Sequence, residues 1–174
     1  MNYLKDIPAG EDAPKVVNVV IEIPKGSQNK YEYDKKLGVF KLDRVLFSPL
    51  HYPGDYGFIP QTLEEDGDPA DALILINFPT YPGMLIEARP IGVLPMIDNG
   101  EPDHKILCVA ANDVRMKHMD SIDDVEDPIL NEIAHFFKVY KELEGKKVEL
   151  SDWKDIAEAY RIITAAQERY ANSK

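Results

Sequence analysis

Residues 66–76 read Asp66-Gly67-Asp68-Pro69-Ala70-Asp71-Ala72-Leu73-Ile74-Leu75-Ile76, an acidic turn that leads directly into an apolar run. Gly67 and Pro69 favour a tight turn, which points the three carboxylates toward a common side. Like charges this close repel each other unless solvent or a bound cation screens them. Carboxylate oxygens suit hard cations such as Mg²⁺ or Mn²⁺. The stretch is therefore either a metal site before a buried strand or a solvated acidic loop.

The segments on both sides of this turn are typical of short β-strands. β-Branched and apolar residues separated by turns predict strands at 16–23, 31–34, 39–47, 72–77, 85–97 and 106–111, with an interruption of 85–97 at Pro90. Residues 51–60 contain too much Pro and Gly for a helix, and their aromatic residues indicate a packed segment with side chains directed into a cleft. Many short strands separated by turns favour a barrel or a sandwich over βαβ units.

Helices are predicted only in the last third of the chain. Asp127 and Pro128 are an N-cap and a first helical residue, and apolar residues then recur at helical spacing until Gly145. A second helix is predicted from Trp153 nearly to the end of the chain. We therefore expect a mainly β protein with helices (α+β), organised as a single domain over residues 1–174.

Composition limits the class of protein. The 20 Lys and Arg residues against 31 Asp and Glu residues give a net charge of −11, which argues against nucleic acid as the main partner. Cys108 is the only cysteine, so an internal disulfide and a Cys-based zinc site are excluded. No apolar run approaches the roughly 20 residues that span a bilayer. We expect a cytoplasmic protein with no membrane partner.

A second acidic turn carries Asp98 and Asp103, with Lys105 two residues later. If this turn lies beside the first one in a closed sheet, five carboxylates converge on one site, and such crowding requires divalent cations. The alternative is an ordinary hairpin turn at Asn99-Gly100 with exposed acids.

Basic residues in and near the strands would suit an anionic substrate. Alternation over residues 39–46 predicts that Arg44 shares one face with Phe40 and Leu42. A partly buried arginine needs an anion, which is either an internal acid or a ligand phosphate. Lys30 precedes a strand, and Lys141 comes late in the first helix. Lys141 would ordinarily be a solvated helix residue.

Three tyrosines are further candidates. Tyr140 lies in the apolar stripe of the first helix, which favours a role in the core. Tyr52 and Tyr56 lie in the packed segment 51–60, where a hydroxyl group can donate to a phosphate oxygen or the ring can simply fill space.

The chain resembles the soluble family I inorganic pyrophosphatases of prokaryotic type. The family signature Asp-x-Asp-Pro-x-Asp is present as residues 66–71, and other landmarks follow in order and spacing. These are Glu22 before a proline turn, Lys30-Tyr31-Glu32, Leu42-Asp43-Arg44, Tyr52-Pro53, Tyr56-Gly57, the segment from Arg89 to Asp98, Asp103 with Lys105, and the segment from His135 to Tyr140-Lys141. The resemblance covers nearly the whole chain.

This resemblance implies a five-stranded closed barrel of the OB type, flanked by two C-terminal helices. It implies hydrolysis of pyrophosphate to two orthophosphates by a metal-activated water, with several Mg²⁺ ions per site and Mn²⁺ or other divalent metals possible. Asp68 would be the general base. The metal ligands would be Asp66, Asp71, Asp98 and Asp103, with Glu22 as an outer contributor. The residues that hold the phosphates would be Lys30, Arg44, Tyr56, Lys105, Tyr140 and Lys141. The residues that support this phosphate site would be Glu32 and Tyr52.

Two other functions remain to be tested. An OB-type module could bind nucleic acid through its aromatic residues, although the clustered acids would repel that ligand. A non-catalytic divalent-metal-binding protein would leave Lys30, Arg44 and Lys141 without a purpose. The short chain resembles the branch of the family that is commonly hexameric, so we expect a homohexamer, and the helix that carries His135 is one candidate for a subunit contact.

Overall fold

Five strands close into a barrel in a computed structural model that describes residues 1–173. The strand order is β1-β4-β5-β9-β6, with β1 at Val17–Ile23, β4 at Asp55–Phe58, β5 at Asp71–Leu75, β9 at Lys105–Ala110 and β6 at Leu85–Leu94. Neighbouring strands are antiparallel except β5 and β9, which run parallel. The predicted barrel with two C-terminal helices is confirmed.

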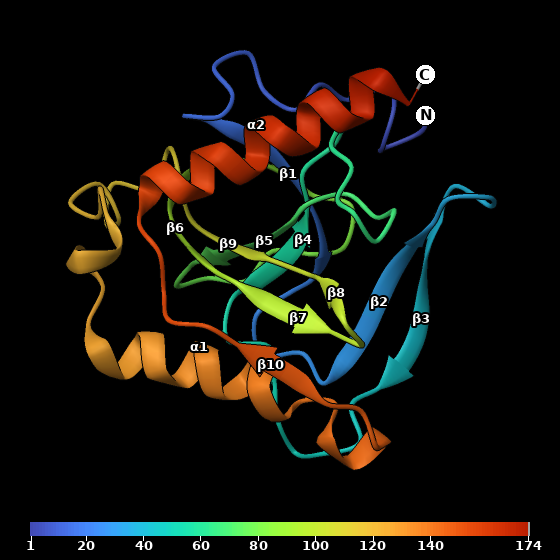
Figure 1. The fold of residues 1–174 in the computed structure, drawn as a ribbon, viewed down its shortest axis with the longest axis vertical. Helices are drawn as coiled ribbons and strands as arrows, with labels where there is room; N and C mark the ends of the chain where they lie inside the picture. The colour runs from blue at the N-terminus through green and yellow to red at the C-terminus, as the bar shows by residue number, and fades with distance from the viewer. Residues whose placement is uncertain (174) are drawn as a thin grey trace.

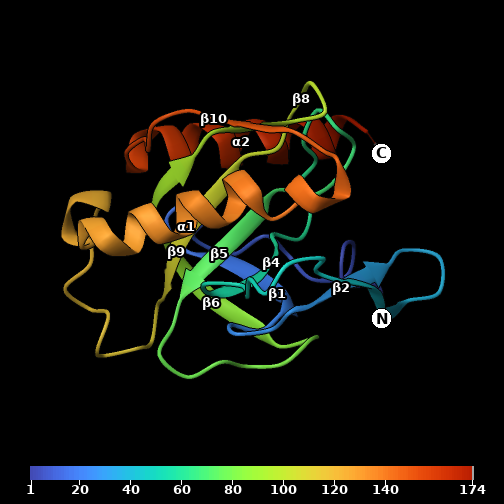
Figure 2. The same ribbon diagram turned by 90° about the horizontal axis from the view of Figure 1, so that it is seen from below.

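The remaining strands lie outside the barrel. A two-stranded hairpin, β2 (Asn29–Asp34) and β3 (Val39–Val45), projects to one side of it (Figure 1). A small sheet contains β7 (Met96–Asp98), β8 (Glu101–Pro102) and β10 (Val148–Leu150). The helices α1 (Asp127–Val139) and α2 (Ile156–Asn172) lie on different sides of the barrel, as the two views show (Figure 2), and short 3₁₀ helices occupy Ile122–Asp124 (η1) and Glu142–Glu144 (η2).

The two helices cover two apolar clusters that share the barrel strands. On β5, Leu73 belongs to a cluster with Phe137 of α1, whereas its neighbour Ile74 belongs to a cluster with Ile163 of α2. Successive side chains of a strand point to opposite faces, so a strand buried on both faces has a continuous apolar sequence. This explains why residues 72–76 lack the alternation of a half-exposed strand.

Gly57 allows β1 and β4 to approach closely. A Cβ atom at this position would lie 1.9 Å from the carbonyl oxygen of Val20, well inside van der Waals contact. Because only glycine fits there, this residue sets the spacing at one seam of the barrel.

Several predicted boundaries differ from the structure. The predicted strand 85–97 breaks at Pro95, between β6 and β7, whereas Pro90 stays within β6 at an irregularity in its pairing with β9. A bulge removes the need for a ladder hydrogen bond from Pro90, so proline is tolerated there. The packed segment 51–60 contains a buried strand, β4, because its Gly and aromatic residues fit against β1 and β5.

The ends of the two helices also differ from the prediction. Glu126, rather than Asp127, is the N-cap of α1, and α1 ends at Val139 instead of continuing to Gly145. The chain then forms η2, which ends at Gly145 in the left-handed conformation. Trp153 precedes α2, whose N-cap is Asp155. No helix within residues 1–173 combines the length and apolar character needed to cross a bilayer.

Candidate active site

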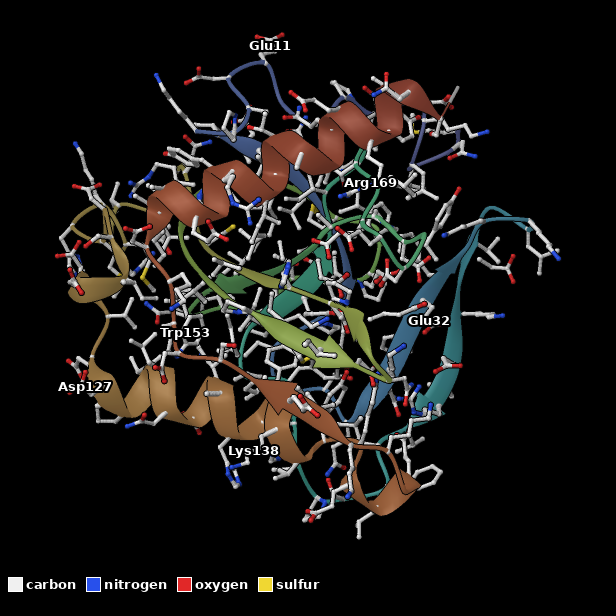
Figure 3. All side chains as sticks on the ribbon, in the orientation of Figure 1. Glu11, Glu32, Asp127, Lys138, Trp153 and Arg169 are labelled. Atoms are coloured by element: carbon white, nitrogen blue, oxygen red, sulfur yellow. The ribbon has the colours of Figure 1, made fainter. Side chains whose placement is uncertain are left out.

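One polar cavity of about 320 Å³, which we call the active-site cavity, contains most of the predicted site residues. It lies between the barrel, the β2–β3 hairpin and the end of α1; Glu32 of β2 is labelled in Figure 3. The predicted residues that line it are Glu22, Lys30, Glu32, Tyr56, Asp66, Asp68, Asp71, Asp98, Asp103, Lys105, Tyr140 and Lys141.

The parallel pairing of β5 and β9 brings the two acidic turns together. Asp71 is the first residue of β5 and Lys105 is the first residue of β9, and these two residues are partners in the register. Both turns precede their strands, so parallel strands in this register place both turns at the same end of the barrel. The five aspartates of the two turns therefore line one cavity.

Lys105 is the buried cation at the centre of the cavity. Its side chain is only 2% exposed, and its Nζ donates to Asp103, to Asp71 Oδ2 at 2.6 Å and to the Tyr56 hydroxyl at 3.0 Å. Burial alone lowers the pKa of a lysine, but Asp71 and Asp103 reverse this effect and raise the pKa of Lys105 well above its usual value. Lys105 is therefore fully charged at neutral pH.

The two carboxylates that contact Lys105 differ in basicity. Burial raises the pKa of Asp71 to about 6, because Lys105 offsets the desolvation only in part and Asp103 adds repulsion. Burial also opposes ionisation of Asp103, but Lys105 outweighs it and keeps the pKa of Asp103 below its usual value. Glu22 is perturbed further: burial raises its pKa to about 8, although the Tyr33 N–H donates to it at 2.7 Å. The cavity thus concentrates more carboxylates than its lysines neutralise.

The end of α1 supplies a second lysine to the cavity. Lys141 donates to Asp98 Oδ2, whereas Asp98 Oδ1 is buried and has no hydrogen-bond partner among residues 1–173. Tyr140 is buried beside it and stacks on Phe136, so its ring belongs to the core while its edge lines the cavity.

Arg44 and Tyr52 are the two predicted residues outside the cavity lining. Arg44 pairs with Asp43 and donates to Glu144 Oε1 at 2.7 Å, while its Nη2 is buried without a partner in the described part of the chain. The prediction that Arg44 shares a face with Phe40 and Leu42 is wrong. The β2–β3 pairing shifts by one residue at this point, so Arg44 is opposite Lys30 and Leu42 is opposite the next residue of β2, Tyr31. Tyr52 is buried behind Tyr56, with ring centroids 5.4 Å apart.

The sequence reasoning missed two polar residues at or beside the cavity. Lys35, in the turn of the β2–β3 hairpin, lines the cavity and pairs with Asp68 at 2.5 Å. Glu64, two residues before the acidic turn, is 7% exposed, and its Oε1 has no hydrogen-bond partner within the 173 described residues. A lysine in a turn and a glutamate before one are both ordinary surface patterns, so the sequence held no signal for either.

Comparison with known proteins agrees with this geometry. The sequence model of the family described as inorganic pyrophosphatase matches residues 19–171. The inorganic pyrophosphatase of Halalkalibacterium halodurans is 54% identical over 157 residues, which cover 90% of this chain and 96% of that protein. The chain belongs to the inorganic pyrophosphatase family.

Solved structures of the family have the same fold. The crystal structure of the Thermus thermophilus inorganic pyrophosphatase superposes with a TM-score of 0.94 at 48% identity and covers 97% of this chain and 99% of that one. A truncated Trypanosoma cruzi vacuolar soluble pyrophosphatase, solved in complex with PPi, has a TM-score of 0.82 at 27% identity and covers 97% of this chain and 77% of that one. The barrel and its two helices are therefore the pyrophosphatase fold.

Membership of this family implies a requirement for divalent metal, and the cavity suits one. Seven carboxylates and four lysines line it, which leaves three negative charges in excess when all of them are ionised. The unpartnered Asp98 Oδ1 and the raised pKa of Glu22 and Asp71 are the expected signs of acids short of a counter-charge. Within residues 1–173, no three acidic, His or Cys side chains already form a metal-ligating group, and Lys105 lies between Asp71 and Asp103. A metal ion would therefore share these carboxylates with Lys105.

Proposed function

We propose that this chain hydrolyses inorganic pyrophosphate to two orthophosphates, with Mg²⁺ as the metal. The observation that carries the proposal is that two acidic turns and three buried or half-buried lysines line one cavity at the end of the barrel. Pyrophosphate is highly anionic, so attack on it requires that its charge be neutralised by cations held in fixed positions. Membership of the inorganic pyrophosphatase family supports hydrolysis of pyrophosphate as the reaction.

We assign Asp66, Asp71, Asp98 and Asp103 as metal ligands and Glu22 as an outer contributor. All of these supply oxygen atoms, which hard divalent cations prefer, and all five line the cavity. When bound, divalent metal ions neutralise phosphoryl oxygens and lower the pKa of water. Mn²⁺ would fit the same oxygen donors.

The phosphate-binding residues in the proposal are Lys30, Arg44, Tyr56, Lys105, Tyr140 and Lys141. Burial and the nearby Asp71 raise the pKa of Tyr56 well above its usual value, so its hydroxyl remains a donor at any physiological pH. The buried, unpartnered Nη2 of Arg44 supports its assignment, because it has a donor left for an anion. Glu32 pairs with Lys30, and Tyr52 packs against Tyr56, which supports their assignment as positioning residues.

Asp68 is the general base in the proposal. Its neighbours in the turn, Asp66 and Asp71, are assigned to metal, whereas Asp68 is exposed and its carboxylate pairs with the side chain of Lys35. An exposed carboxylate that lines the cavity is within reach of water and can accept a proton from it.

The decisive experiment is phosphate release from pyrophosphate. We expect release with added Mg²⁺ and none in excess EDTA. If the purified chain binds Mg²⁺ but releases no phosphate, it is a non-catalytic metal-binding protein, and if it retains single-stranded nucleic acid instead, it is a binding module. Either result would refute the proposal.

We also propose that the chain forms a homohexamer and acts in the cytoplasm. A mainly apolar cavity of about 450 Å³ beside α1 supports a subunit contact there; its lining includes Leu50, Met116, Met119, Ile129 and His135. The one cysteine, Cys108, is buried and free, which suits a reducing compartment. Light scattering after size-exclusion chromatography gives the subunit number, and a monomer at micromolar concentration would refute the assembly.

A further inference from the structure

Lys35 is a cation at the mouth of the active-site cavity, and neither the family signature nor the roles assigned above include it. Its Nζ lies 2.5 Å from Asp68 Oδ1, and both residues line the cavity. Lys35 reaches Asp68 from the β2–β3 hairpin, across 33 residues of sequence. The contact therefore joins the hairpin to the acidic turn.

The turn that carries Lys35 is held by its own hydrogen bonds. Asp34 Oδ1 accepts from the backbone N–H groups of Lys36 and Leu37, each at 2.9 Å, and Asp34 Oδ2 accepts from Lys41 Nζ at 3.1 Å. Gly38 closes the turn with a φ of +70°, which glycine adopts readily. The backbone at Lys35 is thus held in place beside the cavity, while its long and half-exposed side chain can still change partners.

Lys35 differs from the other three lysines of the cavity in its exposure. The side chains of Lys30, Lys105 and Lys141 are 16%, 2% and 12% exposed, whereas that of Lys35 is 50% exposed and its partner Asp68 is 67% exposed. An ion pair between exposed groups stabilises a protein little and exchanges easily with other partners. Lys35 can therefore leave Asp68 at small cost.

Acidic side chains surround Lys35 at the outer part of the cavity. The chain carries a net charge of −11, and the outer part of the cavity presents the carboxylates of Glu32, Asp66 and Asp68 to an approaching anion. A cation at this position lowers the electrostatic barrier to entry of an anionic substrate. It also neutralises the carboxylate that the anion must pass.

We propose that Lys35 is a substrate-binding residue that exchanges Asp68 for a phosphoryl oxygen of pyrophosphate when the substrate enters. The exchange binds the outer phosphoryl group and at the same time frees the carboxylate of Asp68. This inference rests on the proposed pyrophosphatase function. It predicts that Lys35 contributes to capture of the substrate and little to the chemical step.

The test compares Lys35→Gln with Lys36→Gln and Lys35→Arg in steady-state hydrolysis of pyrophosphate. Lys36 is the matched control, because it lies in the same turn, is exposed and does not line the cavity. We expect KM of Lys35→Gln to rise roughly three- to tenfold, as for one exposed charge-assisted contact, with kcat within about twofold of the wild type. Lys36→Gln should match the wild type, and Lys35→Arg should restore most of the lost affinity. The difference in KM should shrink at about 1 M salt, where charges are screened.

Equal KM values for Lys35→Gln and Lys36→Gln would overturn the inference. A loss confined to kcat would also overturn it, because Lys35 would then act on Asp68 and not on the substrate. Circular dichroism and the thermal midpoint of each variant exclude a folding defect. These outcomes can be told apart from failure of the proposed pyrophosphatase function, because in that case the wild type itself would release no phosphate from pyrophosphate.

Discussion

Lys105 Nζ lies 2.6 Å from Asp71 Oδ2, and these two residues are register partners at the start of the parallel strands β9 and β5. The pair therefore links the backbone topology of the barrel to the chemistry of the cavity. It also holds the two acidic turns together, since Lys105 contacts Asp103 of the second turn as well.

Replacing Lys105 with Met should destabilise the fold by about 3–5 kcal/mol in the absence of metal, because buried carboxylates lose their counter-charge. Urea unfolding monitored by tryptophan fluorescence measures this. Added Mg²⁺ should recover part of the loss, since a bound cation replaces the missing charge. Unchanged stability of the variant would show that Lys105 does not neutralise these acids.

Asp68→Asn should lower kcat by about 10²- to 10⁴-fold, the range expected for loss of a general base, while the fold persists. Asp68 is exposed, so its amide analogue leaves no buried group unpaired. Single-turnover phosphate release is the measurement, and Glu65→Gln, in the exposed residue beside the turn, is the control. Wild-type turnover by Asp68→Asn would refute the assigned role.

Affinity for Mg²⁺ should increase between pH 6 and pH 8. Burial raises the pKa of Glu22 to about 8 and that of Asp71 to about 6, so both bind protons at acidic pH, and a cation must displace these protons. Isothermal titration calorimetry in two buffers of different ionisation enthalpy reports the protons released. Glu22→Gln should lose the part of this dependence that lies above pH 7, and an affinity independent of pH would contradict the prediction.

Stability of the metal-free protein relative to Glu64→Gln should fall as pH rises from about 4.5 to 8. Burial raises the pKa of Glu64 from 4.5 to about 8, so the folded state binds more protons than the unfolded state throughout this window. At about 1.4 kcal/mol per pKa unit, the free energy of unfolding relative to Glu64→Gln should fall by at most about 5 kcal/mol between these pH values. Urea unfolding at several pH values measures it.

The matched control for Glu64 is Glu65→Gln. Glu65 is exposed beside Arg169, which Figure 3 labels on α2, so this substitution should leave the pH dependence of stability unchanged. If both variants follow the wild type at every pH, Glu64 is ionised in the folded protein and the prediction fails.

Gly57→Ala should destabilise the barrel by about 3 kcal/mol or more, because the new methyl group would overlap the Val20 carbonyl of β1. Gly26→Ala is the control. A Cβ atom at Gly26 meets open space, and the cost there is only the strain of a φ of +84°, about 1 kcal/mol. Similar thermal midpoints for the two variants would show that β1 and β4 separate easily.

The sequence located the carboxylates of the two acidic turns because each turn is local, whereas the family resemblance implied more distant residues such as Glu22 and Glu32. Asp66, Asp68 and Asp71 share one turn, and carboxylates this close repel each other unless solvent or a cation screens them. Lys35 could not be found in this way, since a lysine in a turn is ordinary and its partner Asp68 lies 33 residues away. Arg44 was identified as an arginine in need of an anion, but only the structure shows that Glu144 provides one.

The sequence predicts a strand or helix well where apolar residues repeat over many positions. It misplaces the end of an element where that end depends on a single residue. Pro95, rather than Pro90, separates β6 from β7, because the pairing of β6 with β9 shifts around Pro90 and tolerates it. The start of α1 at Asp127 instead of Pro128 is a similar case. Tertiary packing determines such ends, and local propensity does not.

The amino-acid sequence by itself determined the acidic turns, the strand-rich first two thirds, the two late helices and the family resemblance, because each depends on neighbouring residues or on their order. The tertiary structure alone decided that β5 and β9 pair in parallel with Asp71 opposite Lys105, and so that the two turns meet. It also decided which carboxylates are deprived of water, and hence that Glu22 and Glu64 hold protons near neutral pH whereas Asp103 does not. Desolvation and charge–charge distance depend on packing in three dimensions, and no pattern along the chain contains them.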